Sequence, residues 1–393
     1  MDDRKISSKF APARVAFNER QADAIPRCHM KKQTHTNPAT QLPHRLVGPP
    51  GSVLEIRPSR SGVSSQERSL AEIMTSSSFF LAVNYPWLDY GCDFGRSPWG
   101  YSGLASLHTR DVVAADFARI RSSGVSLVRW FLLCDGRSGI RYVNGIPAGP
   151  DEFLFTDVAA ALDLASRSSL QICFSLFDFL WLLTPDAPDP TFPGRAALQF
   201  AGGRGALLQK ILVPLVREFR AHPALFAWEI VNEPEWAIPE FQPSQRASLS
   251  LANARSYFSE IAQAVREEAR VPVTLGSARF EWLRAWSEIG LDLLQAHYYP
   301  QSERDQKLSL SQQLGSLSDL AQPLWLGELP ANDPASPEYS LTEALTVCRD
   351  AGLAGAGIWR WRPPESGGPD AAFGFVEPET LLAWSRRSSE FRV

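Results

Sequence analysis

Two glutamates in this sequence stand at the ends of short apolar runs that are typical of buried strands. Glu233 lies in WEIVNEPEW and Glu328 in LWLGELP, so each carboxyl is expected at the last turn of a strand. Either one alone could be a solvated loop acid, as most glutamates are. Together they could form the pair that glycosidic cleavage requires. One carboxyl protonates the leaving oxygen while the other attacks the anomeric carbon, and a separation of about 5 Å permits a covalent glycosyl intermediate.

Other polar side chains stand at the ends of further apolar runs. Arg129 has a guanidinium fork that could hold a carboxylate ionised and oriented, or could form an ordinary salt bridge. Tyr299 could donate its hydroxyl to Glu328, or could pack under a loop at the rim. Asp178 could bind a sugar hydroxyl, cap a loop or form an ion pair, and we predict no catalytic role for it.

His297 follows the same apolar run as Tyr299. It could orient a substrate, relay a proton, or be a hydrogen-bonded structural residue. No second His or Cys stands at ligand spacing from it, and hydrolysis by two glutamates uses no metal. The sequence therefore predicts neither a metal site nor a cofactor.

The chain is rich in aromatic residues, with 12 Trp, 22 Phe and 8 Tyr. Flat rings can stack on the apolar faces of sugars, although many of them must belong to the core. Trp359, at the end of the last apolar run, and Trp236, just beyond Glu233, are the two that we predict to contact a substrate.

A scaffold must bring the ends of these separate runs together. From residue 79 onward, short and nearly apolar segments alternate with helical patterns, which is the sign of β-α units around a parallel sheet. The expected strands are Phe79–Asn84, Ser126–Leu132, Leu170–Phe177, Leu225–Asn232, Val273–Ser277, Leu293–Tyr298, Leu324–Gly327 and Gly355–Trp359. Eight strands with eight helices predict a (β/α)8 barrel, in which the strands' carboxyl ends form the active site. A doubly wound sheet is the structural alternative, but no Gly-rich phosphate loop is present.

The intervening helices have recognisable starts and ends. Thr109 and Thr156 are expected to cap the first two, and the first three are expected to end at Gly124, near Ser168 and at His222-Pro223. Residues 1–75 are rich in Ser, Pro, Arg, Gln and Thr without an apolar period, so we predict a disordered leader followed by a barrel over 76–393. The change in composition also makes Met74 a candidate for the true start.

Composition excludes some classes of partner. A net charge of −4 without a basic run argues against nucleic acid or an anionic membrane surface. Five cysteines without regular spacing indicate neither a disulfide framework nor a zinc site. Because the first residues also lack the apolar stretch of a secretion signal, we expect a cytoplasmic protein. A carbohydrate substrate is the one partner predicted, and nothing indicates the oligomeric state.

The segment Trp228-Glu229-Ile230-Val231-Asn232-Glu233-Pro234 resembles the strand-four signature of the clan A retaining glycoside hydrolases, most nearly family 5 and its mannanases. The resemblance spans residues 79–390. It implies that Glu233 is the acid/base, that Glu328 is the nucleophile and that Asn232 holds the sugar 2-hydroxyl. By the same resemblance, Arg129 steadies the nucleophile, His297 and Tyr299 form the strand-six pair, and Trp359 is the strand-eight platform.

The chain departs from family 5 at one position, because Phe177-Asp178-Phe179 stands where that family usually carries a His. A sister family of the clan is therefore an alternative. The resemblance implies a β-linked glucan, mannan or related oligosaccharide as substrate. A transglycosylase on the same site and a non-catalytic carbohydrate-binding barrel remain as alternative functions. Phosphate or aldol chemistry would need a phosphate cradle or a strand-end lysine, and neither is evident.

Overall fold

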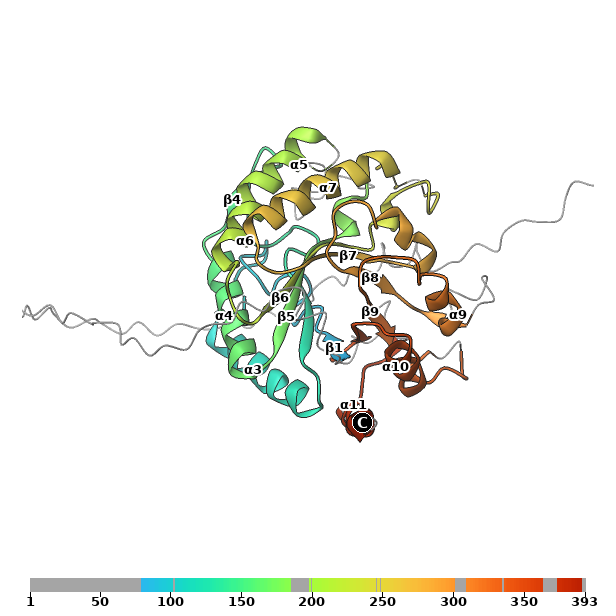
Figure 1. Cartoon of the computed structure of the whole chain (residues 1–393). Coiled ribbons are helices and arrows are strands. Elements are labelled where there is room, and N and C mark those ends of the chain that lie inside the picture. Colours follow the sequence, from blue (N-terminus) through green and yellow to red (C-terminus); the bar gives the residue numbers. More distant parts are fainter. Residues whose placement is uncertain are drawn as a thin grey trace, which may run out of the picture. The chain divides into compact units, whose positions relative to one another are not determined.

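The computed structural model describes residues 79–390 except 102, 185–197, 199, 245, 248, 301–308, 334–335 and 363–372. In this described part, eight parallel strands close into a barrel in the order β1-β10-β9-β8-β7-β6-β5-β2, with helices around it (Figure 1). The predicted (β/α)8 barrel is confirmed. The predicted leader, residues 1–75, and the candidate start Met74 lie outside the described residues.

The strands follow the apolar runs of the sequence closely. Their bounds are β1 (Phe80–Asn84), β2 (Leu127–Phe131), β5 (Gln171–Asp178), β6 (Leu225–Asn232), β7 (Val273–Ser277), β8 (Leu294–His297), β9 (Leu324–Pro330) and β10 (Gly355–Trp359). The main difference is at β9, which continues beyond Gly327 because Leu329 and Pro330 still pair with β10. Glu328 therefore lies inside its strand, whereas Glu233 follows the end of β6.

Most positions on these strands are buried, as expected where helices cover the outside of a barrel and side chains fill the inside. All eight residues of β6 are buried, including Glu229, whose side chain is completely shielded from solvent. A charged group in such a place requires a partner of opposite charge. This requirement determines much of the site described below.

The helices of the barrel are α3 (Leu107–Ser122), α4 (Leu154–Arg167), α5 (Ala201–Leu207), η3 (Leu208–Leu212), α6 (Val213–Phe219), α7 (Leu251–Glu268), η5 (Phe280–Ala285), α9 (Leu310–Gly315), α10 (Leu341–Asp350) and α11 (Pro378–Glu390). The expectation of eight α-helices is wrong in one unit. The structure describes every residue of the connection between β7 and β8, and the helix in this connection is the six-residue 3₁₀ helix η5. This connection has 16 residues and must return from the carboxyl end of β7 to the amino end of β8, so little length is left for a longer helix.

The two predicted threonine caps are also wrong. Thr109 lies inside α3, where its Oγ1 accepts a hydrogen bond of 2.8 Å from Ser106, the residue before the helix. Thr156 lies inside α4, and Asp151 takes the capping role there, since its Oδ1 accepts from the amides of Phe153 and Leu154 at 2.9 Å. A carboxylate is a stronger acceptor for the free amides of a first turn than a hydroxyl.

A β-hairpin between β2 and α4 was not expected from the sequence. Strand β3 (Ile140–Val143) pairs with β4 (Ile146–Pro150) in antiparallel register. Asn144 and Gly145 form the turn with φ of 51° and 74°, the left-handed pair that Asn-Gly favours in two-residue hairpins. The hairpin belongs to the second β-α connection, so it is inserted at the end of the barrel where the active site of this fold lies.

In the described part of the chain, no helix has the length and apolar character that crossing a bilayer would require.

Candidate active site

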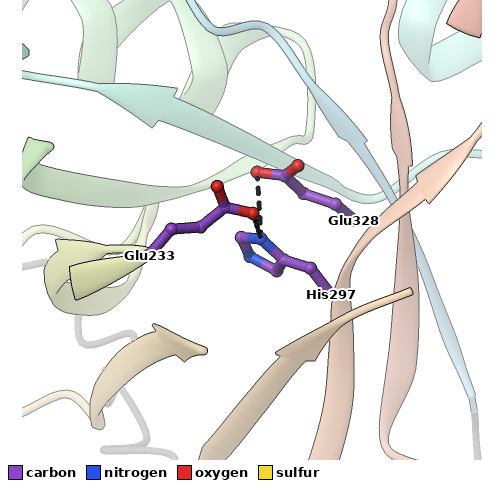
Figure 2. Close-up of side chains that lie close together, drawn as sticks. All are labelled: Glu233, His297 and Glu328. Carbon is purple, nitrogen blue, oxygen red and sulfur yellow. Dashed lines mark hydrogen bonds and ion pairs between the residues drawn. The ribbon is translucent and has the colours of Figure 1, made fainter. Parts of the chain in front are cut away.

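Glu233, His297 and Glu328 converge at the carboxyl ends of β6, β8 and β9 (Figure 2). The Nδ1 atom of His297 lies 2.8 Å from Oε1 of Glu233 and 3.4 Å from Oε1 of Glu328. One carboxylate oxygen from each glutamate and the imidazole nitrogen all lie within 4.8 Å of one another. This close approach of carboxylate oxygens fits the pair of a retaining glycosidase, whose carboxyl groups are about 5 Å apart.

The backbone at Glu233 turns sharply to bring its carboxyl into this position. Its φ of +46° is left-handed, which is uncommon for a residue with a Cβ atom. Its amide donates to the carbonyl of Gly276 on the neighbouring strand β7 at 2.7 Å, and Pro234 then starts a short 3₁₀ turn. Held in this way, the strained conformation aims the side chain across the barrel mouth.

Arg129 connects the strands beneath the two glutamates. Its Nη1 donates to Glu328 at 2.7 Å and to Asn84 at 2.8 Å. Its Nε and Nη2 both donate to Glu229 at 2.6 Å, and Nη2 also donates to Asn232 at 2.7 Å. The predicted contact of Arg129 with Glu328 is therefore present, but the two-pronged pairing of the guanidinium is with Glu229.

Electrostatics differ between these carboxyls. Burial alone would raise the pKa of Glu229, but the charge and hydrogen bonds of Arg129 hold that pKa below its usual value. Burial raises the pKa of Glu328, and the nearby His297 and Arg129 oppose the increase. Burial raises the pKa of Glu233 as well, against the hydrogen bond from Trp236. The pKa values of Glu233 and Glu328 are thus shifted in the same direction, and a raised pKa suits the member of the pair that must be protonated when substrate binds.

Tyr299 and Trp236 each donate to one of the paired carboxylates. The hydroxyl of Tyr299 donates to Oε2 of Glu328 at 2.6 Å, and burial raises the pKa of that hydroxyl, which keeps its proton in place. The Nε1 atom of Trp236 donates to Oε2 of Glu233 at 2.7 Å, while its ring packs edge-on against Trp282. The contact observed for Trp236 is with the carboxylate, and a contact of its ring with sugar stays a prediction.

Asn232 is held between two groups that fix its amide. Its Oδ1 accepts from Arg129, and its Nδ2 donates to Oδ2 of Asp178 at 2.8 Å. Asp178 also accepts from the amide of Leu180 at 2.9 Å, so the loop-capping alternative holds for this residue. Burial raises the pKa of Asp178 to about 8. Asp178 thus orients Asn232 through this hydrogen bond, and it also interacts with Glu233 electrostatically.

Trp359 lies at the end of β10, with 8% of its surface exposed. Its ring packs edge-on against Trp87 at 6.3 Å and against Phe131 at 6.4 Å, and Phe131 in turn lies under the guanidinium of Arg129. The eight residues chosen from the sequence are thus brought together, seven of them through hydrogen bonds and Trp359 through Phe131.

His297 is fully buried, and burial lowers its pKa to about 4, so the ring is neutral near pH 7. With Glu233 and Glu328 it could present three ligand atoms to a metal ion. Imidazole and carboxylate suit several divalent metals, provided that the nitrogen facing the ion carries no proton.

Two buried residues of this network, Glu229 and Gln295, were not predicted from the sequence. Gln295 donates to Oε2 of Glu229 at 3.0 Å and lies 3.3 Å from Nε2 of His297. One signal was available for Glu229, because a charged residue in the middle of an eight-residue apolar strand must be paired inside the barrel. Gln295 stands two residues before His297, so strand alternation places both on one face.

Comparisons with known proteins agree with this architecture. No protein-family model matches the chain. A mannan endo-1,4-β-mannosidase of Cryptopygus antarcticus is 25% identical over 160 residues, which are 40% of this chain and 38% of that protein. One of Mytilus edulis is 26% identical over 172 residues, 43% of this chain and 42% of that protein. The matched regions therefore span well under half the length of these curated relatives.

Among solved structures, the endo-1,4-β-mannanase of Eisenia fetida superposes with a TM-score of 0.58 at 20% identity, covering 77% of this chain and 95% of that chain. A likeness at this level of identity shows the shared fold. The fold and the paired carboxylates define the class of the molecule, a (β/α)8 barrel with two facing glutamates at its mouth.

Proposed function

We propose that this protein is a retaining β-glycoside hydrolase that cleaves β-linked chains of the mannan type. The observation that carries the proposal is the placement of carboxylate oxygens of Glu233 and Glu328 within 4.8 Å of each other, one from β6 and one from β9. The two matched relatives are mannan endo-1,4-β-mannosidases, which favours a β-1,4-mannan over a glucan.

In the first step, Glu233 gives its proton to the glycosidic oxygen while Glu328 attacks the anomeric carbon. The bond from that carbon to the leaving oxygen breaks, and a glycosyl ester forms on Glu328. Arg129 and Tyr299 each donate to Glu328 in the free protein, so they favour its ionised form against the effect of burial and orient it for attack.

In the second step, Glu233 is ionised and acts as the base. It takes a proton from a water molecule whose oxygen attacks the anomeric carbon, and the ester bond to Glu328 breaks. Oε2 of Glu233 accepts the N–H of Trp236, which supports the ionised form that this step needs, and Oε1 lies 2.8 Å from Nδ1 of His297. Two inversions leave the sugar with its original β configuration.

A row of aromatic rings supports a chain, rather than a single sugar, as the substrate. It runs from Trp359 to Trp87 at 6.3 Å and on to Tyr90 at 4.6 Å. The guanidinium of Arg137 then lies 5.6 Å from the ring of Tyr90 and 5.0 Å from the ring of Trp99. Trp99 is 44% exposed. Since Arg137 lies over its ring, Trp99 can offer exposed ring surface to a sugar bound at the far end of this row.

The test is hydrolysis of aryl β-glycosides and β-1,4-linked manno- and cello-oligosaccharides by the wild type, Glu233→Ala and Glu328→Ala, with azide as a rescuing nucleophile. We expect Glu328→Ala to give an α-glycosyl azide and Glu233→Ala a β-glycosyl azide. Glu288→Ala removes an exposed glutamate paired with Arg255 and serves as the control that keeps full activity. Full activity in either catalytic variant would refute the assignment.

The same assay separates the alternative functions. Products longer than the substrate at high acceptor concentration would indicate transglycosylation, in which a sugar hydroxyl replaces water in the second step. Binding of oligosaccharides without cleavage of any of them would indicate a carbohydrate-binding barrel.

A further inference from the structure

Gln295 on β8 is a fully buried amide in the layer beneath the catalytic pair. Two glycines on the neighbouring strands leave room for its side chain. A Cβ atom at Gly327 on β9 would overlap the amide of Gln295, and one at Gly276 on β7 would come within 3.0 Å of its Nε2. The barrel is therefore built to hold this side chain in one position between Glu229 and His297.

The charge of Glu229 determines which way the amide faces. Arg129 binds the Glu229 carboxylate with two hydrogen bonds of 2.6 Å, and Ser175 donates to it at 2.9 Å, so this carboxylate is an ionised acceptor. Gln295 must turn its NH₂ group toward it, because the reverse orientation would place a carbonyl oxygen against the negative charge. The NH₂ group then lies 3.0 Å from Oε2 of Glu229.

The same NH₂ group lies 3.3 Å from Nε2 of His297. The NH₂ group of Gln295 can only donate hydrogen bonds, so the atom that it contacts must be an acceptor. Nε2 of His297 must therefore be the unprotonated nitrogen of the ring. A neutral imidazole carries its single hydrogen on the other nitrogen. We infer that Gln295 acts as a positioning residue, which fixes His297 in the Nδ1–H form and makes this N–H a constant donor to the paired glutamates.

The orientation of the Gln295 amide has an energetic cost, which supports a functional role for this residue. Within the described part of the chain, no donor reaches Oε1 of Gln295, although this atom is buried. Buried carbonyl groups are normally hydrogen-bonded, and an exception requires an explanation. The explanation here is that both hydrogens of the amide are required on the opposite side, by Glu229 and by His297.

Three consequences follow for the site. The Nδ1–H group donates to Oε1 of Glu233 at 2.8 Å, so His297 cannot accept the proton that Glu233 delivers and is no proton relay. That proton must occupy a lone pair of Glu233 that neither His297 nor Trp236 uses. A protonated Nδ1 is also unable to bind a metal ion between the glutamates.

The consequence for pH dependence rests on the proposed hydrolase function. A constant N–H donor stabilises ionised Glu233. With Gln295→Met, Nε2 of His297 is free to take the hydrogen, and Nδ1 can accept from the acid O–H of Glu233, which stabilises the protonated form. The basic limb of the kcat/KM profile should therefore move to higher pH. In the described part of the chain, the charged or titratable groups that face Glu233 are Arg129, Asp178, Glu229, Arg279, His297, Tyr299 and Glu328.

The direct test is long-range ¹H–¹⁵N spectroscopy of the full chain labelled with ¹⁵N-histidine. The chain has six histidines, and the signals lost in His297→Asn identify those of His297. We expect the wild type at pH 7 to show neutral His297 with Nδ1 protonated, and Gln295→Met to shift it largely to the Nε2–H form that free histidine prefers. A wild-type spectrum with Nε2 of His297 protonated would overturn the inference, even if Gln295→Met does not fold.

The matched control is Gln313→Met, which removes another buried glutamine, on α9. It should leave both the His297 signals and the basic limb unchanged, whereas Gln295→Met should move both. A basic limb that stays in place although the tautomer changes would refute the proposed effect on Glu233. Absence of any glycoside hydrolysis would count against the proposed function alone, since the tautomer is measured without substrate.

Discussion

Arg129 and Glu229, both fully shielded from solvent, form a two-pronged ion pair with two N–O distances of 2.6 Å beneath the catalytic glutamates. The pair links β2 to β6 across the inside of the barrel. The guanidinium of Arg129 also donates hydrogen bonds to Glu328 and Asn232. Loss of one partner would leave a buried charge without compensation, which is costly in a low-dielectric interior.

Glu229→Gln should therefore destabilise the fold by about 3 to 5 kcal/mol and reduce activity, because Arg129 loses its charged anchor. Urea unfolding and kcat/KM on the same preparations measure the two effects. Glu268→Gln, which breaks the exposed pair with Arg217, is the control and should change stability little. Equal stability of the two variants would show that the buried pair is not what fixes Arg129.

The strands could be predicted because each is a compact apolar run. β6, β7 and β10 have the predicted bounds, since Glu233 follows Leu225–Asn232, Pro272 precedes Val273–Ser277 and Arg360 follows Gly355–Trp359. Glu233 and Glu328 were visible for the same reason, because each ends or interrupts such a run near the mouth of the barrel. Residue type and strand position together were enough to select them.

The supporting network could not be predicted from single segments. Glu229 and Gln295 lie inside strands, and their role depends on which residues of β2 and β8 face them across the barrel, a relation that only the closed fold defines. The cap at α4 was missed for a local reason, since Asp151 lies five residues before Thr156 and competes better for the free amides. The Asn144-Gly145 dipeptide is a sequence signal for a two-residue hairpin, but it was overlooked because the segment was interpreted as part of the β-α pattern.

Tyr299→Phe should lower kcat/KM roughly 10- to 100-fold, because a hydrogen bond to a charged group contributes about 1.5 to 3 kcal/mol. The hydroxyl of Tyr299 donates to Oε2 of Glu328 at 2.6 Å and favours its ionised form. Without this donor the pKa of Glu328 should rise, so the acid limb of the pH–rate profile should move to higher pH. Tyr142→Phe, which loses a hydroxyl bonded to the carbonyl of Gly136, should leave that limb unchanged. An unmoved acid limb in Tyr299→Phe would contradict the predicted role.

Trp99→Ala should change activity in a way that depends on substrate length. Its exposed ring lies at the far end of the aromatic row, so we expect it to contact only a long chain that binds along the whole row. We expect a higher KM for long β-1,4-oligosaccharides and no change for aryl glycosides. Leu107→Ala, which removes an exposed side chain at the start of α3, is the control for loss of an exposed apolar group. An equal increase in KM for short and long substrates would argue against a distant sugar site.

Asp178 should make the fold less stable as the pH rises. Burial raises its pKa to about 8 from an ordinary value of 3.8, so between these values the folded chain holds a proton that the unfolded chain has released. Folding then binds this proton, and the free energy of unfolding contributed by Asp178 falls as the pH increases from about 4 to about 8.

Asp178→Asn removes this titration. Urea unfolding at pH 5 and pH 8 should show a smaller loss of stability in the variant, while Asp163→Asn, at an exposed carboxyl, should behave as the wild type. Parallel pH dependence in all three proteins would mean that Asp178 is ionised in the folded barrel, bound as a carboxylate by Asn232 and the amide of Leu180.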